Sequence, residues 1–253
     1  DSRFHDVVDA ALTAGCKVLS VPRSVAVAGV EPTLVWRSNQ PLVELTTPTL
    51  RGGQMIVKRA VDLIGSILGL IVATPIMLLV SLLVKLDSPG AVFFRQNRVG
   101  RSGRLFTIFK FRTMVSDAEQ HREELLEQSI YADRRLFKIV RDPRVTRLGM
   151  LLRRTSIDEL PQLFNVFKGE MSLVGPRPPI PCEVDLYEAH HYARFDVKPG
   201  ITGPWQVAGR NQITDFEEIV ALETRYIRTW SPLGDLAILI RTIGVVLRMR
   251  GAH

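Results

Sequence analysis

The sequence predicts a mostly helical α+β protein in which one long apolar segment enters a membrane. Residues 58–85 read KRAVDLIGSILGLIVATPIMLLVSLLVK, and apolar runs of about 18 residues or more are typical of membrane-embedded helices. After residue 87 the chain alternates turn signals with short strand and helix patterns. We therefore expect two domains. The first is a partial α/β segment (1–54), and the second (55–253) combines a membrane segment at about 57–86 with helices and a small β-hairpin or sheet.

Residues 1–54 carry an α/β pattern of their own. A helix pattern spans 4–14, Gly15 marks a turn, and strand patterns follow at 17–21 and 41–48. A segment of this size buries too little surface to be stable alone. Because the chain also lacks an initial Met, we interpret this segment as the end of an upstream α/β domain in a longer protein.

The flanks and the middle of the apolar run favour a segment that returns to the side from which it entered. Lys58 and Arg59 precede the run and Lys85 ends it, so the positive-inside rule indicates no direction of crossing. Thr74 and Pro75 lie near the middle, and a proline removes a backbone donor and bends a helix. A Pro-kinked spanning helix remains the alternative, because the run is long enough to cross a bilayer.

The excess of basic over acidic residues favours negatively charged binding partners. The 253 residues include 33 Lys and Arg against 26 Asp and Glu, a net charge of +7. This balance suits nucleic acid, anionic lipid or phosphorylated small molecules, and it is also usual for the cytoplasmic surface of a membrane protein. The sequence contains no Walker A loop, dinucleotide fingerprint or serine-nucleophile motif, which argues against those enzyme classes.

Turn residues and apolar patterns place the elements of the water-soluble part. They predict a hairpin or small sheet with a basic face (88–114), a charged helix (117–128), two helices joined at 154–156 (144–169), an amphipathic helix (215–230) and a helix that is apolar on one side (233–250). The last helix is too short and too charged to cross a bilayer, but it suits a membrane surface.

The best candidates for catalysis are the adjacent carboxylates Asp158 and Glu159 in TSIDELPQLFN. One interpretation is structural, because Ser156 and Glu159 have the spacing of a capping box and the helix dipole favours Asp158. The other is chemical, because the same dipole keeps a carboxylate ionised, and an ionised Asp can bind Mg²⁺ or attack phosphorus. The residues alone leave both interpretations open.

Several residues near this pair are candidates for binding a phosphorylated ligand. Arg177 stands between two prolines in GPRP, which hold its backbone and suit bidentate contact with a phosphate. Lys110 and Arg112 alternate with phenylalanines, so both face one side of a predicted strand. The Gly-rich segment KPGITGPWQVAGR would let a backbone approach a ligand, and its Trp205 suits stacking on a base or anchoring at a lipid interface.

Four segments in order carry a resemblance to a known family: KRAVDLIGSILGLIVATP, FRQNRVGRSGRLFTIFKFRTM, DPRVTRLGMLLRRTSIDELPQLFNVFKGEMSLVGPRP and KPGITGPWQVAGRN. The chain from about 55 to 253 resembles the bacterial sugar transferases, which are monotopic polyprenyl-phosphate glycosyl-1-phosphate transferases (phosphoglycosyl transferases). Residues 1–54 resemble the end of the Rossmann-like domain that precedes the catalytic domain in larger members.

The resemblance implies a fold and a reaction. The membrane segment would be a re-entrant helix–break–helix, with its break at Thr74 and Pro75. Asp158 would attack the β-phosphate of a UDP-sugar, so that UMP leaves and an aspartyl phosphosugar remains. Undecaprenyl (polyprenyl) phosphate would then accept the sugar phosphate in a ping-pong mechanism, with Mg²⁺ held at Asp158 and Glu159. This would be the first membrane step of exopolysaccharide, O-antigen or capsule synthesis.

The resemblance also implies binding residues, partners and location. The expected substrate-binding residues are Arg98, Lys110, Arg112, Arg177, Gln206 and Arg210. Trp205 receives no role, because Gly203-Pro204-Trp205 departs from the Trp-Ala form of small members. We expect the bacterial inner membrane, a catalytic domain on its cytoplasmic face, and UDP-sugar, undecaprenyl phosphate and membrane lipids as partners, without nucleic acid. An assembly role for residues 1–54 would suggest a homodimer.

Two other functions fit parts of the sequence. A membrane-anchored basic protein without catalysis, binding nucleic acid or anionic lipid, would explain the charge. It would not explain the carboxylate pair, the proline-flanked Arg177 or the Gly-rich loop. A membrane-bound Mg²⁺-dependent diphosphate hydrolase would use the same carboxylates, but it would release sugar phosphate to water without a lipid acceptor.

Overall fold

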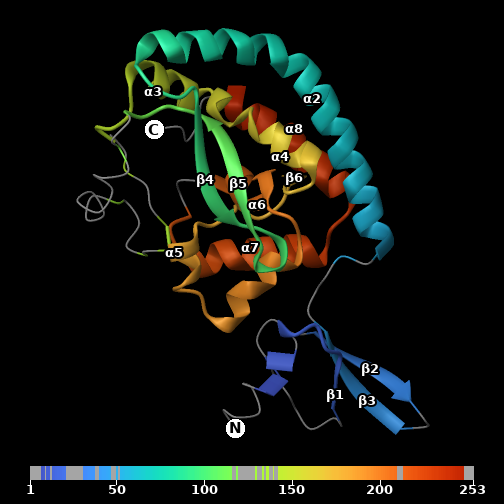
Figure 1. Ribbon diagram of the computed structural model, residues 1–253. Coiled ribbons are helices and arrows are strands. Elements are labelled where there is room, and N and C mark those ends of the chain that lie inside the picture. The colour runs from blue at the N-terminus through green and yellow to red at the C-terminus, as the bar shows by residue number, and fades with distance from the viewer. Residues whose placement is uncertain are drawn as a thin grey trace.

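In the computed structural model, a long apolar helix curves over a body of shorter helices and a β-hairpin, and the N-terminal strands form a sheet of their own (Figure 1). The structure describes residues 7–8, 10–11, 13–20, 31–37, 40–46, 50, 52–115, 118, 129, 133, 135–136, 139, 142–209 and 213–247.

The N-terminal sheet is antiparallel. It consists of β1 (Val18–Ser20), β2 (Glu31–Arg37) and β3 (Gln40–Thr46) in the order β1–β3–β2. The described residues between 7 and 13 are helical and Gly15 has a φ of +74°, so the predicted helix, turn and first strand are confirmed where they are described. β3 coincides with the second predicted strand. All described pairings in this N-terminal sheet are antiparallel, so a Rossmann-like arrangement is not confirmed.

The predicted membrane segment is one continuous helix, α2 (Gly52–Asp87), which includes Pro75. The expected helix break at Thr74 and Pro75 is therefore not seen, and Figure 1 shows α2 curving instead. A proline removes a single donor, here the one that would reach the Ile71 carbonyl, and the turns on either side remain helical. The Thr74 hydroxyl donates to the Leu70 carbonyl at 2.6 Å, not to the Ile71 carbonyl.

One side of α2 packs on the body and the other is bare. Met77, Val80 and Val84 pack with Phe111 in a core cluster. The exposed side is apolar, at Ile64, Leu68, Ile71, Val72, Leu78, Leu79, Leu82 and Leu86. In the described part of the chain, α2 is the one helix long and apolar enough to cross a membrane. So extended an apolar surface indicates contact with lipid, and it fits a re-entrant as well as a spanning helix.

The predicted hairpin is confirmed. β4 (Phe93–Val99) and β5 (Leu105–Phe111) pair antiparallel around η1 (Arg101–Gly103), a 3-10 turn. Directly after β5, Arg112 donates hydrogen bonds to the carbonyls of Val84, Ser88 and Pro89, at 3.3, 2.6 and 2.6 Å. Arg112 therefore joins the hairpin to the C-terminal end of α2, where helix carbonyls lack intrahelical donors.

The remaining elements form the helical body. In chain order they are α3 (Arg147–Arg154), η3 (Ile157–Glu159), α4 (Gln162–Lys168), β6 (Ser172–Val174), α5 (Pro181–Val184), η4 (Ala189–Asp196), β7 (Gly200–Thr202), α6 (Pro204–Gly209), α7 (Phe216–Arg228) and α8 (Pro232–Leu247). The predicted helices in 144–169, 215–230 and 233–250 are confirmed by α3, α4, α7 and α8. The predicted helix at 117–128 lies, apart from Ala118, outside the described residues.

α8 exposes an apolar stripe, as expected of a helix at a membrane surface. The exposed residues follow helical spacing: Leu233, Leu236, Ile240 and Ile243. On the other side, Ile238 packs into a core with Tyr226, Ile227 and Trp230. The stripe fits contact with a lipid surface.

Two glycines of the Gly-rich loop, Gly200 and Gly203, serve backbone packing, and the approach of this loop to a ligand stays a prediction. β6 and β7 form a parallel pair, with Ser172 opposite Gly200. A Cβ atom on Gly200 or on Gly203 would collide with the backbone of Gly175. The loop that contains Arg177 is thus held against β7 by main-chain contact.

A buried ionic cluster fastens the start of α2 to the body. The Lys58 ammonium lies 2.7 Å from an Asp235 carboxylate oxygen, and both side chains are almost fully buried. Tyr226 and Trp230 also donate to this carboxylate, at 2.7 and 3.0 Å. Nearby, Ser172 donates to Asp62 of α2 at 2.8 Å. These contacts supply the partners that a charge needs when it is removed from water.

Asp196 is expected to make stability depend on pH. Its Oδ2 atom is buried without a hydrogen-bond partner in the described structure. Burial raises the pKa of Asp196 from 3.8 to about 6, although Arg101 opposes the rise. The buried acid resists ionisation, so stability is complete below about pH 4 and falls as the pH rises through 6.

We expect Asp196→Asn to stabilise the protein at pH 7.5 by about 1 kcal/mol, after a discount for partial solvent screening. The variant should also flatten the pH dependence between about pH 4 and 7. Thermal unfolding across this range, with the exposed Glu218→Gln as control, measures both effects. An unchanged slope in Asp196→Asn would assign the pH dependence to other groups.

Candidate active site

One cavity of about 870 Å³ collects most of the predicted site residues. Of the set proposed from the sequence, it is lined by Arg98, Lys110, Arg112, Asp158, Glu159, Arg177 and Gln206. Arg210 lies outside the described residues. Among the described residues, eight Lys and Arg and four Asp and Glu side chains line the cavity. This size and this charge suit a phosphorylated ligand.

A sharp turn places Asp158 in the cavity. α3 starts at its N-cap Thr146, whose side chain accepts from the Gly149 amide at 2.9 Å. After α3, Ser156 adopts the left-handed conformation, with a φ of +56°, which is strained for a residue with a side chain. The chain then enters η3, where Asp158 is 8 % exposed.

The residues on either side of the carboxylate pair pack against the apolar helix α2. Ile157 and Leu160 pack against the cluster that contains Met77 and Val80 of α2. The position of Asp158 is therefore fixed relative to the apolar helix, since packed interiors do not deform freely.

The capping-box interpretation of Ser156 and Glu159 is wrong. The Ser156 side chain makes no cap hydrogen bond, and its backbone is left-handed. Glu159 instead pairs with Lys110 of β5 at 2.8 Å. An ion pair across two elements replaces the local cap, because the hairpin brings a cation to the carboxylate.

Arg153 is a site residue that the sequence reasoning missed. It lines the cavity, and its Nε donates to the Thr113 hydroxyl at 2.9 Å. Burial lowers the pKa of Arg153, and the nearby Asp158 carboxylate opposes this shift. The Arg153 guanidinium and the Asp158 carboxylate therefore attract each other in the cavity. The available signal was the Arg153-Arg154 pair directly before TSIDEL.

Arg177 is held by a buried acid as well as by its prolines. Its guanidinium pairs with both oxygens of Glu183, at 3.2 and 3.3 Å. Burial acts to lower the pKa of Arg177, but the Glu183 carboxylate raises it by more. Glu183 also accepts from the Ile180 amide at 3.1 Å, so the acid that orients Arg177 is itself fixed.

A second buried pair holds the backbone of Arg177. The Arg177 amide donates to Glu223 at 3.1 Å, and Arg194 donates to the Arg177 carbonyl at 3.3 Å. Arg194 also bonds to Glu223 and to the Tyr187 hydroxyl. Because Glu223 is 0 % exposed, these hydrogen bonds are shielded from water, and they set the position of the Arg177 loop.

Two further predicted binding residues, Arg98 and Arg112, also hydrogen-bond to other parts of the protein. Arg112 binds carbonyls at the end of α2, as described above, so its guanidinium has a structural role in this conformation. Arg98 donates to the Pro178 carbonyl at 2.9 Å and to the Gln96 side chain at 2.7 Å, which ties β4 to the Arg177 loop. Their substrate-binding roles stay predictions, and these contacts do not favour them.

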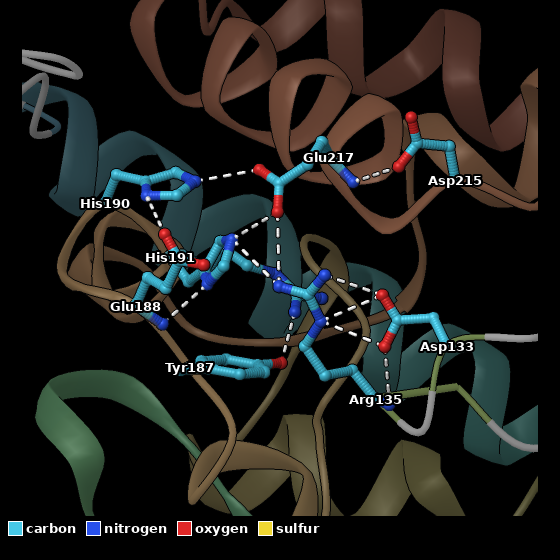
Figure 2. A network of polar contacts seen from close by, with 9 residues as sticks. Asp133, Arg135, Tyr187, Glu188, His190, His191, Asp215 and Glu217 are labelled. Carbon is cyan, nitrogen blue, oxygen red and sulfur yellow. Dashed lines mark hydrogen bonds and ion pairs between the residues drawn. The ribbon is translucent and has the colours of Figure 1, made fainter.

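Among the described residues, one cluster of three possible metal ligands lies outside the carboxylate pair: His190, His191 and Glu217. Figure 2 shows both imidazoles directed at the Glu217 carboxylate, each at 2.8 Å. His191 Nδ1 accepts from the Glu188 amide, so the proton of the neutral ring is on Nε2, which faces Glu217.

The surroundings favour a hydrogen-bonded network there over a metal. The Arg135 guanidinium lies 3.3 Å from His191 Nε2 and 3.2 Å from Glu217 (Figure 2). Partial burial raises the pKa of Glu217, but hydrogen bonds from His190 and His191 lower it by more, to about 2. A protonated Nε2 and a fixed cation both oppose a metal ion.

Comparison with known proteins identifies the class. Residues 53–249 match the model of the bacterial sugar transferase family. The chain therefore belongs to the bacterial sugar transferase family. The matched residues include those that line the cavity, the carboxylate pair and all of α2 except Gly52.

Individual relatives are similar over most of this chain. It is 46 % identical over 198 residues to "Galactosyl transferase CpsE" of Streptococcus agalactiae, covering 78 % of this chain and 44 % of the relative. It is 38 % identical over 236 residues to "Undecaprenyl-phosphate galactose phosphotransferase" of Salmonella typhimurium, covering 91 % and 49 %. It is 41 % identical over 219 residues to "UDP-glucose:undecaprenyl-phosphate glucose-1-phosphate transferase" of Caulobacter vibrioides, covering 81 % and 78 %. The chain spans about half the length of the first two.

Proposed function

We propose that this protein transfers a sugar 1-phosphate from a UDP-sugar to undecaprenyl phosphate, giving undecaprenyl-diphospho-sugar and UMP. The names of the galactose and glucose transferases among its relatives support this class of substrate. The observation that carries the proposal is the cavity itself, where a buried carboxylate lies among cations and is packed against an apolar helix. This site would meet a water-soluble diphosphate and a lipid-borne phosphate together.

Two displacements at phosphorus would share this site. An oxygen of Asp158 forms a bond to the β-phosphorus of the UDP-sugar, the bond from that phosphorus to the bridging oxygen breaks, and UMP leaves with the electron pair. An oxygen of undecaprenyl phosphate then attacks the same phosphorus, and the bond to Asp158 breaks to regenerate the carboxylate. The covalent intermediate lets two bulky anions use one site in turn.

Cations of the cavity would offset the charge of both substrates. Arg177 would contact a phosphate, with Glu183 holding its guanidinium and Glu223 holding its backbone amide. Lys110 pairs with Glu159 and would be released to the diphosphate by a competing cation. Asp158 and Glu159 suit Mg²⁺, which takes one or two carboxylates together with water and phosphate oxygens. Bound Mg²⁺ would neutralise part of the diphosphate charge.

The membrane arrangement follows from the same surfaces. We propose that α2 enters the cytoplasmic face of the bacterial inner membrane and returns, so that the basic residues at both of its ends stay in the cytoplasm. The bare sides of α2 and α8 would contact lipid. The sugar would enter exopolysaccharide synthesis, the role named for an "Exopolysaccharide production protein ExoY" of Rhizobium meliloti that is 39 % identical over 199 residues.

UMP release tests the proposal and separates it from a diphosphate hydrolase. Purified protein would be assayed with UDP-galactose, UDP-glucose and other UDP-sugars, with Mg²⁺, with and without undecaprenyl phosphate. We expect sustained UMP release with at least one UDP-sugar only when the lipid acceptor is present. Sustained release without the acceptor would support the hydrolase, and no release with any UDP-sugar would contradict both enzymes.

A further inference from the structure

The indole N–H of Trp205 is a buried donor that no described residue satisfies. Trp205 lies in α6, is 4 % exposed and lines the cavity of the active site. An unsatisfied buried donor costs about 1–3 kcal/mol, so it calls for an explanation such as a ligand. Its neighbour Gln206 adds a buried acceptor, Oε1, that no described residue satisfies, and Gln206 also lines this cavity.

The surroundings of Trp205 differ from those of the carboxylate pair. Trp205 packs with Leu136, Phe216, Ile219 and Val220 in an apolar cluster. Leu136 also lines the cavity, together with Ile139 and Ile180. The charged lining comes from other elements, with Lys110 on β5, Arg153 on α3 and Asp158 in η3. Burial also excludes the earlier suggestion that Trp205 anchors the protein at a lipid interface.

We call the side of the cavity formed by Trp205, Leu136, Ile139 and Ile180 the apolar wall. Its chemistry suits the nucleobase of a UDP-sugar better than the diphosphate or the sugar. An indole N–H is a donor only, so the ligand atom must be an acceptor. A diphosphate would be drawn to the cations, and a sugar would present hydroxyl groups that need polar partners. Uracil is flat, has apolar faces and carries carbonyl acceptors at its edge. We propose that Trp205 Nε1–H binds a uracil carbonyl and that this wall is the nucleobase subsite; the inference rests on the proposed function.

A pair of matched tryptophan variants tests the subsite. Trp205→Phe removes a donor without a partner among the described residues, so the melting temperature should fall less than in Trp230→Phe, which loses a similar buried volume and also a hydrogen bond. The dissociation constant of UMP should rise about 10-fold, the equivalent of one hydrogen bond. The affinity for inorganic pyrophosphate should not change. Trp230→Phe removes a donor that binds Asp235 at 3.0 Å, so it should lower the melting temperature and leave UMP affinity within about 2-fold.

Calorimetric titration of the full chain with UMP and with pyrophosphate, together with thermal unfolding, gives all these values. Equal UMP affinity in wild type and Trp205→Phe would overturn the subsite alone. A melting temperature of Trp205→Phe as low as that of Trp230→Phe would also overturn it, because the N–H would then have a structural partner. Wild-type protein that binds no UMP would overturn the proposed function together with the subsite.

Discussion

Asp158→Asn is expected to lower sugar-phosphate transfer by about 10³-fold or more, because an amide cannot form the acyl phosphate bond. The loss should appear in kcat, since the substitution keeps the shape of the side chain and the cationic lining of the cavity. The substitution also removes the charge that favours the protonated form of Arg153. UMP release with undecaprenyl phosphate and the best UDP-sugar measures the effect.

The control is Asp185→Asn, which neutralises an exposed carboxylate outside the cavity lining and should keep full activity. Membrane association and the melting temperature should be the same for both variants, because Ile157 and Leu160 still pack on α2. Activity near the wild-type level in Asp158→Asn would remove Asp158 from the role of nucleophile.

Asp235→Ala is expected to produce the largest loss of stability. It leaves the Lys58 ammonium buried without a counter-charge, and it removes the acceptor of Tyr226 and Trp230. Breaking a buried pair in this way costs about 3–5 kcal/mol. For a chain of this size, the corresponding drop in melting temperature is about 10 °C or more. Thermal unfolding in detergent or lipid nanodiscs measures it.

The double variant Lys58→Met, Asp235→Asn separates the charge from the hydrogen bonds. It removes both charges but keeps one acceptor oxygen, which can serve either Tyr226 or Trp230, since the two donors contact different oxygens of Asp235. Because a buried ion pair can be replaced by neutral groups at little cost, we expect this double variant to be more stable than Asp235→Ala. A loss below about 1 kcal/mol in Asp235→Ala would show that this cluster does not hold α2 on the body.

The parts of the fold that sequence predicts are those with strong local patterns. α2 is a long apolar run, and the hairpin is two alternating segments around Gly100 and Gly103, so both were found. The continuity of α2 through Pro75 was not, because a missing donor can end, break or only bend a helix, and packing decides which. The antiparallel N-terminal sheet was also missed, since strand direction depends on long-range pairing.

The candidate site divides in the same way. Asp158, Arg177 and Lys110 stand in recognisable local settings, and they line one cavity. The residues that hold these side chains in place have no such local signal. The acids that hold Arg177 lie further along the chain, Glu183 by 6 residues and Glu223 by 46. The pairing of Lys58 with Asp235 spans 177 residues. Local rules also misled for Glu159, where an ion pair with Lys110 replaces the expected cap.

The covalent role of Asp158 is tested most directly by the mass of the intact protein after incubation with a UDP-sugar and Mg²⁺ in the absence of undecaprenyl phosphate. We expect wild-type protein to gain one sugar phosphate, located by peptide mapping on Asp158, and to lose it when the lipid acceptor is added. Asp158→Asn should gain nothing. Wild-type protein that stays unmodified while it transfers sugar phosphate to the lipid would contradict the covalent mechanism and indicate direct transfer.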